Sequence, residues 1–250
     1  MQRICAQCSV FSIITPLSPI QVWVRTGAEN KNASGVLHVY LENDGAAFIN
    51  PTQIAANPSL RASFLMMRLM QEDNNTSLYF SRPCYGFAAN QMPTTCNAHY
   101  WTDARYSAEV VATLLHALDE AKKHLNKPAE KIILIGHSGG GSLALLMAQQ
   151  RNDVQAVITL AGNLDTDAWV QLHHYSPLSL SLNPFAQPLL PAAIKRWYFA
   201  GAEDNNIPFS SIKPSCKRDP SAHCQVLVGV SHEQGWLAHW PKILAQINNN

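Results

Sequence analysis

The sequence is poor in charge and has no long apolar run. Asp, Glu, Lys and Arg make up 14% of its 250 residues and the formal net charge is +1, whereas about a quarter of the residues in a typical globular domain are charged. No basic tract or aromatic-basic stripe is present, so nucleic acid is not expected as a partner. No apolar stretch reaches the ~20 residues that a membrane-spanning helix needs. A chain of this length can form one domain with a full core.

The amino terminus lacks a complete signal peptide, because residues 1–10 contain no apolar core of the kind that export signals require. We interpret residues 1–19 as a separate N-terminal segment. One hypothesis is that this segment is the remnant of a signal or lipoprotein leader. In that case Cys5 or Cys8 carries a lipid that attaches the protein to a membrane.

The cysteines do not follow a zinc-binding pattern. Cys84 and Cys96 lie in loop-like sequence, as do Cys216 and Cys224, and neither pair has a second close pair to complete a zinc site. We predict two local disulfides, each stabilising the fold by roughly 2–3 kcal/mol. Disulfides imply an oxidising compartment, so the protein is predicted to be periplasmic or secreted. The alternative is free thiols in an intracellular protein.

What the sequence does contain is a G-x-S-x-G pentapeptide at Gly136–Gly140. The short apolar run 132–135 precedes it and an apolar, helix-prone run follows. The order strand, G-x-S-x-G, helix is that of a nucleophile elbow, in which small neighbours allow a serine to adopt a strained turn at the end of a strand. We therefore predict that Ser138 is a catalytic nucleophile, with an ordinary Gly-Ser turn as the alternative.

Strands and helices alternate through the second half of the chain. This alternation predicts the α/β class, with a mostly parallel central sheet flanked by helices. The first two expected strands, 20–25 and 35–41, are predicted to form a hairpin. Further strands are expected at 77–81, 131–135, 154–160, 197–200 and 225–230, and helices at 107–125, 141–150 and 236–247.

Residues 20–250 are predicted to form a single domain. Residues 162–194 interrupt the alternation with several prolines and many leucines. This insert is too short for a large cap domain, and we expect it to act as a short lid over the site.

A catalytic serine needs a histidine base and a carboxylate that orients it. His232 follows the last expected strand directly and is our candidate base. His223 precedes that strand and lies at its wrong end, while His173 and His174 lie on the insert, where they could contact substrate. The carboxyl ends of the strands are where such folds bind their ligands.

The carboxylate is predicted to be Asp204, which follows the strand expected at 197–200. Asp165 and Asp167 follow the preceding strand and are the main alternatives, and Glu203 is expected to face another way. The resulting chain order of Ser, Asp and His is that of a nucleophile-elbow hydrolase.

The developing oxyanion needs two backbone N–H donors. Gly139, directly after the nucleophile, is predicted to supply one. The loop after the strand 35–41 is predicted to supply the second from Gly45 or Ala46, with an ordinary Asp-Gly turn as the alternative.

With these residues assembled, the chain resembles the α/β-hydrolase fold family, and within it bacterial exported or lipoprotein-type hydrolases of unassigned substrate. The resemblance covers about residues 20–245 and is carried by the elbow, Gly201-Ala-Glu-Asp204 and Ser231-His232. Further segments that carry it are Val39–Gly45, Arg82–Cys84, Trp101–Ser107 and Asn163–Trp169. It implies a Ser138–His232–Asp204 triad with serine-esterase chemistry. The segment Glu42-Asn43-Asp44-Gly45 departs from the His-Gly that is usual in the wider family.

The predicted function is hydrolysis of small carboxylic esters or thioesters through an acyl-enzyme on Ser138, without a metal or organic cofactor. The alternatives are a peptidase or an acyltransferase that uses the same triad, and a catalytically silent envelope-binding protein.

Overall fold

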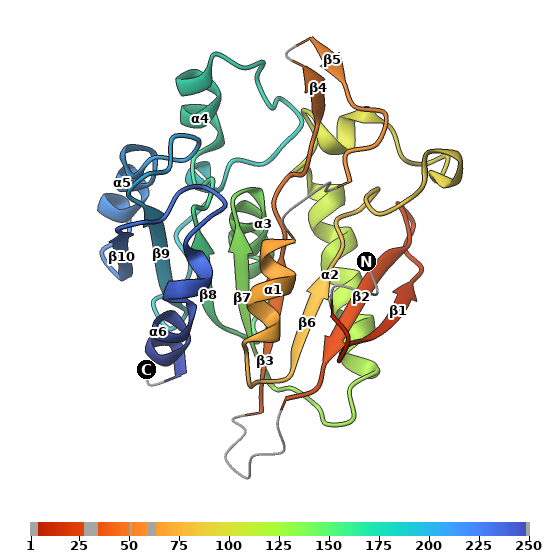
Figure 1. Ribbon diagram of the computed structural model, residues 1–250, viewed down its shortest axis with the longest axis horizontal. Coiled ribbons are helices and arrows are strands. Elements are labelled where there is room, and N and C mark those ends of the chain that lie inside the picture. The colour runs from red at the N-terminus through yellow and green to blue at the C-terminus, as the bar shows by residue number, and fades with distance from the viewer. Residues whose placement is uncertain (1–4, 28–34, 51, 60–63, 249–250) are drawn as a thin grey trace.

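The computed structural model describes residues 5–27, 35–50, 52–59 and 64–248. In this part of the chain eight strands form one central sheet (Figure 1). In sheet order they are β1 (Ser9–Ile13), β2 (Ile20–Arg25), β6 (Ser77–Phe80), β3 (Val36–Leu41), β7 (Lys131–His137), β8 (Val154–Leu160), β9 (Lys195–Gly201) and β10 (Ala222–Leu227). β2 runs antiparallel to both of its neighbours, and every pair from β6 to β10 is parallel.

Helices cover both faces of this sheet. α1 (Leu65–Gln71) and α6 (Trp236–Asn248) lie on one face, where the indole of Trp240 donates to the carbonyl of Leu69 (2.9 Å). α2 (Ala108–Lys123) and α3 (Gly139–Ala148) lie on the other face. The central strands are buried on both sides because helices cover them twice, which explains their continuous apolar sequences.

The predicted α/β class with a mostly parallel sheet is confirmed, but the prediction that the strands 20–25 and 35–41 form a hairpin is wrong. β2 and β3 are not neighbours, because β6 lies between them and pairs antiparallel with β2 and parallel with β3. The partner of both strands comes from far along the chain, so no local pattern reveals it.

The last strand is also displaced from its predicted place. β10 ends at Leu227, opposite Gly201 at the end of β9. Gly229 then adopts a φ of 74°, which turns the chain away from the sheet. Val230 therefore lies in the loop that carries His232, and the predicted strand at 225–230 starts and ends too late.

Three disulfides are present. Cys84 bonds to Cys96 and Cys216 to Cys224, which are the two predicted pairs. The cysteines of the second pair do not lie in loops as predicted, since Cys216 is in α5 (Phe209–Arg218) and Cys224 is in β10. Three bridges are consistent with an extracellular or periplasmic protein.

The third bridge, Cys5–Cys8, was not predicted. A sulfur in a disulfide has no valence for a lipid thioether, so this structure gives no support to lipid attachment at either residue. None of the helices in the described residues is long and apolar enough to cross a membrane.

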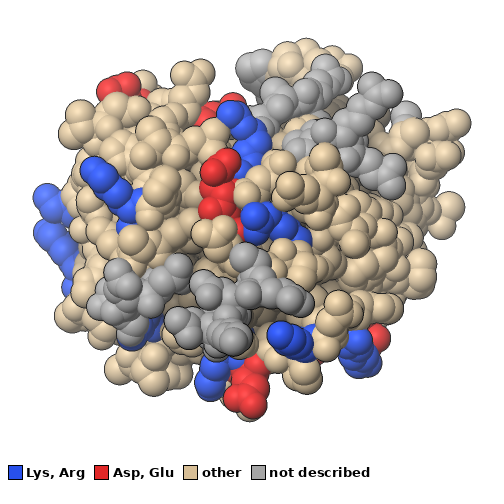
Figure 2. Space-filling model, turned by 60° about the horizontal axis from the view of Figure 1, so that its bottom comes forward, with Lys and Arg blue, Asp and Glu red and all other residues tan. Residues whose placement is uncertain are grey.

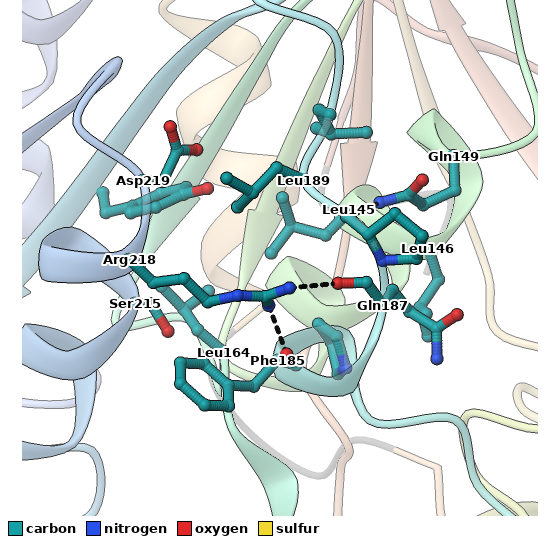
Figure 3. A pocket seen from close by; sticks show the side chains of 14 residues that line it. Leu145, Leu146, Gln149, Leu164, Phe185, Gln187, Leu189, Ser215, Arg218 and Asp219 are labelled. Atoms are coloured by element: carbon teal, nitrogen blue, oxygen red, sulfur yellow. Dashed lines mark hydrogen bonds between the residues drawn. The ribbon is translucent and has the colours of Figure 1, made fainter.

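The insert 162–194 forms one short helix, α4 (Thr166–His173), and then a strap, which we define as residues 174–194. The strap contains a single turn of 3₁₀ helix, η3 (Pro184–Ala186). Arg218 holds it by donating to the carbonyls of Phe185 and Gln187 (Figure 3). The side chain of Gln149 donates to the carbonyl of Pro188. The strap is thus tied to α5 and to the end of α3 at residues 185–188.

A small, largely apolar cavity lies under this part of the strap, between α3 and α5. Figure 3 shows leucines of α3 and of the strap on its walls. Neither Ser138, Asp204 nor His232 lines it.

Candidate active site

Ser138 stands in a sharp turn between β7 and α3. Its backbone angles, a φ of 54° and a ψ of −121°, lie outside the regions that non-glycine residues normally adopt. Neighbouring backbone holds this geometry, since the Ser138 N–H donates to Leu160 (3.0 Å) and its carbonyl accepts from Gly141 (2.9 Å) and Asn163 (3.1 Å). The turn is a nucleophile elbow, with strain kept in place by the surrounding chain.

The elbow glycines are needed because the turn is crowded. A Cβ atom at Gly136 would lie 2.1 Å from the carbonyl oxygen of Gly140. A Cβ atom at Gly140 would lie 2.2 Å from the carbonyl oxygen of Leu41. Both contacts are with backbone, which cannot move aside as a side chain could, so only glycine fits at these positions.

The structure brings Ser138, His232 and Asp204 into one hydrogen-bonded chain. Nε2 of His232 lies 3.1 Å from Oγ of Ser138, and Nδ1 lies 2.8 Å from Oδ2 of Asp204. Because a carboxylate only accepts, Nδ1 of His232 carries the proton and Nε2 is left with a lone pair. This is the arrangement in which a histidine can remove a proton from a serine.

Asp204 is buried but well bonded. Its Oδ1 accepts the backbone N–H groups of Asn206 and Ile207, each at 2.8 Å. The two oxygens therefore have separate tasks, since Oδ1 fixes the loop and Oδ2 fixes the imidazole.

The loop of His232 is anchored through its own carbonyl. Nε2 of His137 lies 2.7 Å from this oxygen and the indole of Trp236 donates to it at 3.0 Å. Burial, with a smaller effect from the nearby His232, lowers the pKa of His137 to about 3. His137 therefore stays neutral near pH 7 and can act as this donor. Its Nδ1 is buried without a hydrogen-bond partner among the described residues.

Sequence reasoning missed Asn206. Its side-chain Nδ2 lies 3.0 Å from Nε2 of His232. The amide N–H and the Ser138 hydroxyl can therefore both donate to the same lone pair. The Asn206 Oδ1 accepts from the indole of Trp169 (3.3 Å), and its carbonyl lies 2.7 Å from Nε2 of His173. Asn206 thus connects the histidine base to α4. The only signal in the sequence was its position two residues after Asp204.

The predicted second oxyanion donors are not available. The N–H of Gly45 donates to the side chain of Asn43 (2.9 Å), and the N–H of Ala46 donates to the carbonyl of Pro58 (3.1 Å). The first bond closes a local turn and the second ties the loop to residues twelve positions later, so both N–H groups already have an acceptor. Within the described residues, the backbone N–H groups of Gly139 and Asp44 make no such bond. A Cβ atom on Gly139 would lie 2.1 Å from Oδ1 of Asp44, so the two segments are in direct contact.

A buried polar cluster holds the loop of Asp44. Arg82 and Tyr106 donate short hydrogen bonds to its carboxylate, and Nη1 of Arg105 lies 3.3 Å from Oδ2. Tyr85 donates to the Asp44 carbonyl (2.8 Å). Burial alone would raise the pKa of Asp44, but the two guanidinium groups lower it below its ordinary value. The aspartate is therefore ionised and fixed beside the elbow.

Comparison with known proteins agrees with this geometry. A family model described as alpha/beta hydrolase fold matches residues 80–215, a range that includes Ser138 and Asp204 and ends before His232. The chain belongs to the α/β hydrolase fold family. No curated protein sequence is significantly similar to it.

Solved structures with this fold cover nearly the whole chain. An α/β serine hydrolase without a lid from Xanthomonas campestris has a TM-score of 0.59 at 12% identity, over 98% of this chain and 94% of that chain. An esterase from Pyrococcus furiosus has a TM-score of 0.62 at 13% identity, over 97% and 90%. An acylaminoacyl peptidase from Pyrococcus horikoshii has a TM-score of 0.64 at 12% identity, over 96% of this chain but only 41% of the peptidase. At such identities these likenesses show the fold alone.

The other candidate carboxylates of this α/β hydrolase lie in α4 and beside the triad. Asp165 caps α4 by accepting the N–H of Ala168 (3.2 Å), and Asn183 bonds to both Asp165 and Asp167. Glu203 is exposed, and among the described residues its carboxylate makes no bond to His232.

Of the three other candidate histidines, His173 reaches the surroundings of the triad through Asn206. His174 ends α4 in a left-handed conformation. His223 stacks on Trp197 in β10 with ring centroids 5.7 Å apart, and it stays at the opposite end of the strand from His232.

Proposed function

We propose that this α/β hydrolase cleaves carboxylic esters or thioesters through an acyl-enzyme on Ser138. The observation that carries the proposal is the continuous hydrogen-bonded chain from Oγ of Ser138 through His232 to Asp204. The esterase and peptidase structures with the same fold support hydrolase activity, and they do not identify the substrate.

In the proposed reaction, Nε2 of His232 removes the Ser138 proton as Oγ attacks the substrate carbonyl. Asp204 stabilises the imidazolium that forms. His232 then gives the proton to the leaving alcohol or thiol, which departs and leaves an ester on Ser138. A water molecule, activated by the same histidine, attacks this ester and releases the acid.

The oxyanion is proposed to be stabilised by the backbone N–H groups of Gly139 and Asp44. Each donor of this kind is worth ~3–4 kcal/mol in the transition state. The buried guanidinium groups of Arg82 and Arg105 hold the Asp44 loop, so they are positioning residues in this scheme.

The three disulfides support the further proposal that the protein works outside the cytoplasm, in the periplasm or after secretion. Attachment to a membrane through an N-terminal lipid stays a hypothesis.

The proposal is tested by hydrolysis of p-nitrophenyl acetate, butyrate and octanoate, with Ser138→Ala as the matched variant. We expect wild-type activity and a loss of about 10³-fold or more in the variant, because the remaining groups cannot replace a nucleophile. Equal rates for the two proteins would contradict the proposal and favour the silent binding protein. Activity on blocked peptides but not on esters would favour a peptidase, and faster transfer to added alcohols than to water would favour an acyltransferase.

A further inference from the structure

Several long stretches of the sequence contain no Asp, Glu, Lys or Arg. Two of them, residues 4–24 and 132–150, supply strands of the sheet and the helix after the elbow. Three further uncharged segments are residues 45–59, 83–102 and 168–194. In a chain that is 14% charged such runs are common, so the meaning of these three segments depends on where they lie in the fold.

All three segments gather at the end of the molecule that carries Ser138. The first contains the hairpin of β4 (Phe48–Asn50) and β5 (Gln53–Ile54), the second the short 3₁₀ helices η1 (Ala89–Gln91) and η2 (Ala98–Trp101), and the third α4 and most of the strap. Figure 1 shows the hairpin, the yellow loop with its short helices and α4 projecting beyond the same end of the sheet. This is the end at which β7 and β8 finish and the elbow begins.

Hydrogen bonds join these segments to one another and to the site. The indole of Trp101 donates to the carbonyl of Ala55 (2.9 Å), and the side chain of Asn57 donates to the carbonyl of Phe87 (2.6 Å). The backbone N–H of Leu182 in the strap donates to the carbonyl of Tyr106 (3.0 Å), whose hydroxyl bonds to Asp44. The uncharged segments therefore form a connected surround of the triad.

Large apolar side chains are exposed on two sides of this surround. Phe48, Ile49 and Ile54 are 44%, 58% and 46% exposed on the hairpin. The insert exposes Leu172, Tyr175 and Leu180, which are 48%, 54% and 57% exposed. We call these six side chains the rim. Ile14 and Val228 are more exposed, at 74% and 80%, but they stand singly and not in a group. Exposed apolar side chains that gather near a site are where an apolar partner can bind.

We propose that the rim docks on the surface of an oil-like aggregate of uncharged esters, from which single ester molecules enter the site of Ser138. This inference rests on the proposed esterase function. It narrows the substrate class from small soluble esters to uncharged, poorly soluble ones.

Charge decides between an oil surface and an anionic membrane. Binding to anionic lipids relies on clustered Lys and Arg, each worth about 1 kcal/mol near the surface. The segments that carry the rim have none. Figure 2 turns the other end of the molecule toward the viewer, and there Lys, Arg, Asp and Glu side chains of both signs reach the surface. An uncharged surface is complementary to an uncharged partner.

The first experiment measures docking without catalysis. Protein with Ser138→Ala is mixed with emulsified trioctanoin, and the fraction that floats with the droplets is measured. We expect binding that changes little with salt and that falls about tenfold when Ile49→Glu and Leu180→Glu are added, because two half-exposed apolar side chains are replaced by charges. Val226→Glu is the matched control, since Val226 is 40% exposed on β10, an edge strand of the sheet that belongs to none of the three uncharged segments. This control is expected to bind like the parent.

The second experiment measures turnover with the serine intact. The rate on tributyrin is expected to rise steeply above the solubility limit of the ester, and the rim variants are expected to lose about tenfold only there. On dissolved p-nitrophenyl acetate the same variants should stay within about twofold of wild type.

Four results would overturn the docking proposal. One is a tributyrin rate that passes smoothly through the solubility limit, and another is equal behaviour of the rim and Val226 variants. A third is flotation with anionic vesicles but not with trioctanoin. The fourth is a wild-type dimer that Ile49→Glu converts to a monomer without changing droplet binding, which would mean that a second copy covers the rim. Loss of all esterase activity with droplet binding intact would instead contradict the proposed function and leave docking supported.

Discussion

At the scale of single residues, Asn206 competes with the nucleophile for the histidine base. Its amide Nδ2 lies 3.0 Å from Nε2 of His232, while Oγ of Ser138 lies 3.1 Å away. The amide N–H and the serine hydroxyl can both donate to the one lone pair of Nε2. Asn206 is therefore a positioning residue for the base.

Replacing Asn206 with leucine should lower kcat/KM on p-nitrophenyl acetate by about fivefold, because a hydrogen bond with a net value of about 1 kcal/mol no longer holds the imidazole of His232. Asn206→Asp is the matched control, since it keeps the size of the side chain but has no N–H to donate to Nε2, and it should lower kcat/KM at least as much. Initial rates at pH 8 measure both. A rate for Asn206→Leu equal to that of wild type would mean that the amide has no part in holding His232.

Glu42 directly follows β3 and is almost fully buried. Burial raises its pKa from 4.5 to about 7, although backbone N–H groups of Asn43 and Met66 partly oppose this. The folded protein therefore keeps a proton that the unfolded chain releases above pH 4.5. Consequently this group's contribution to stability is full below pH 4.5 and is lost as the pH rises to about 7.

Glu42→Gln should remove this loss. Two and a half pH units correspond to roughly 3 kcal/mol, so the variant should gain up to about this free energy of unfolding relative to wild type at pH 8 and little at pH 4. Urea denaturation at the two pH values measures the difference. Glu130→Gln, at an exposed position, is the control and should leave the pH dependence unchanged. An equal effect of both substitutions would contradict the assignment to Glu42.

At the scale of elements, two disulfides of similar span have different neighbours. Cys84 lies between Arg82 and Tyr85, which hold the carboxylate and the carbonyl of Asp44. Cys216–Cys224 ties α5 to β10 at the edge of the sheet. Both bridges restrict the unfolded chain, but only the first lies beside the elbow.

Replacing either pair with serines should lower the free energy of unfolding by about 2–3 kcal/mol. Only the loss of Cys84–Cys96 should also reduce kcat/KM on p-nitrophenyl acetate, by about tenfold, because ~1.4 kcal/mol of lost positioning corresponds to that factor. Thermal unfolding and rates measured at a temperature where both variants are folded separate the two effects. Equal kcat/KM for the two variants would show that the Cys84 bridge has no part in holding the Asp44 loop.

Elements with a local pattern could be predicted from the sequence, and those that depend on distant partners could not. The helix of residues 108–123 has an apolar stripe and a serine cap, so its place was predictable. The insertion of β6 between β2 and β3 leaves no trace in either strand. The prediction of the second oxyanion donor failed for a similar reason. The N–H of Ala46 is bonded to the carbonyl of Pro58, twelve residues further along the chain, and no local pattern reveals that contact.

At the scale of the whole molecule, chain order was enough to identify Ser138, Asp204 and His232 as a group, because each follows a strand in the order that the fold requires. The groups around them were not predictable. Asp44, Arg82 and Arg105 are far apart in sequence and meet only in the folded protein. The fold therefore indicates the class of chemistry, and the substrate has to be inferred from the surface around the site.

The strap is held in a way that has a consequence for evolution. Arg218 bonds to carbonyls of Phe185 and Gln187, Gln149 bonds to that of Pro188, and Leu182 bonds through its own backbone N–H. These bonds use the main chain of the strap and not its side chains. Mutations along the strap can therefore change its side chains while the path of the main chain stays the same. In this way the protein can acquire a new substrate preference without first losing its fold.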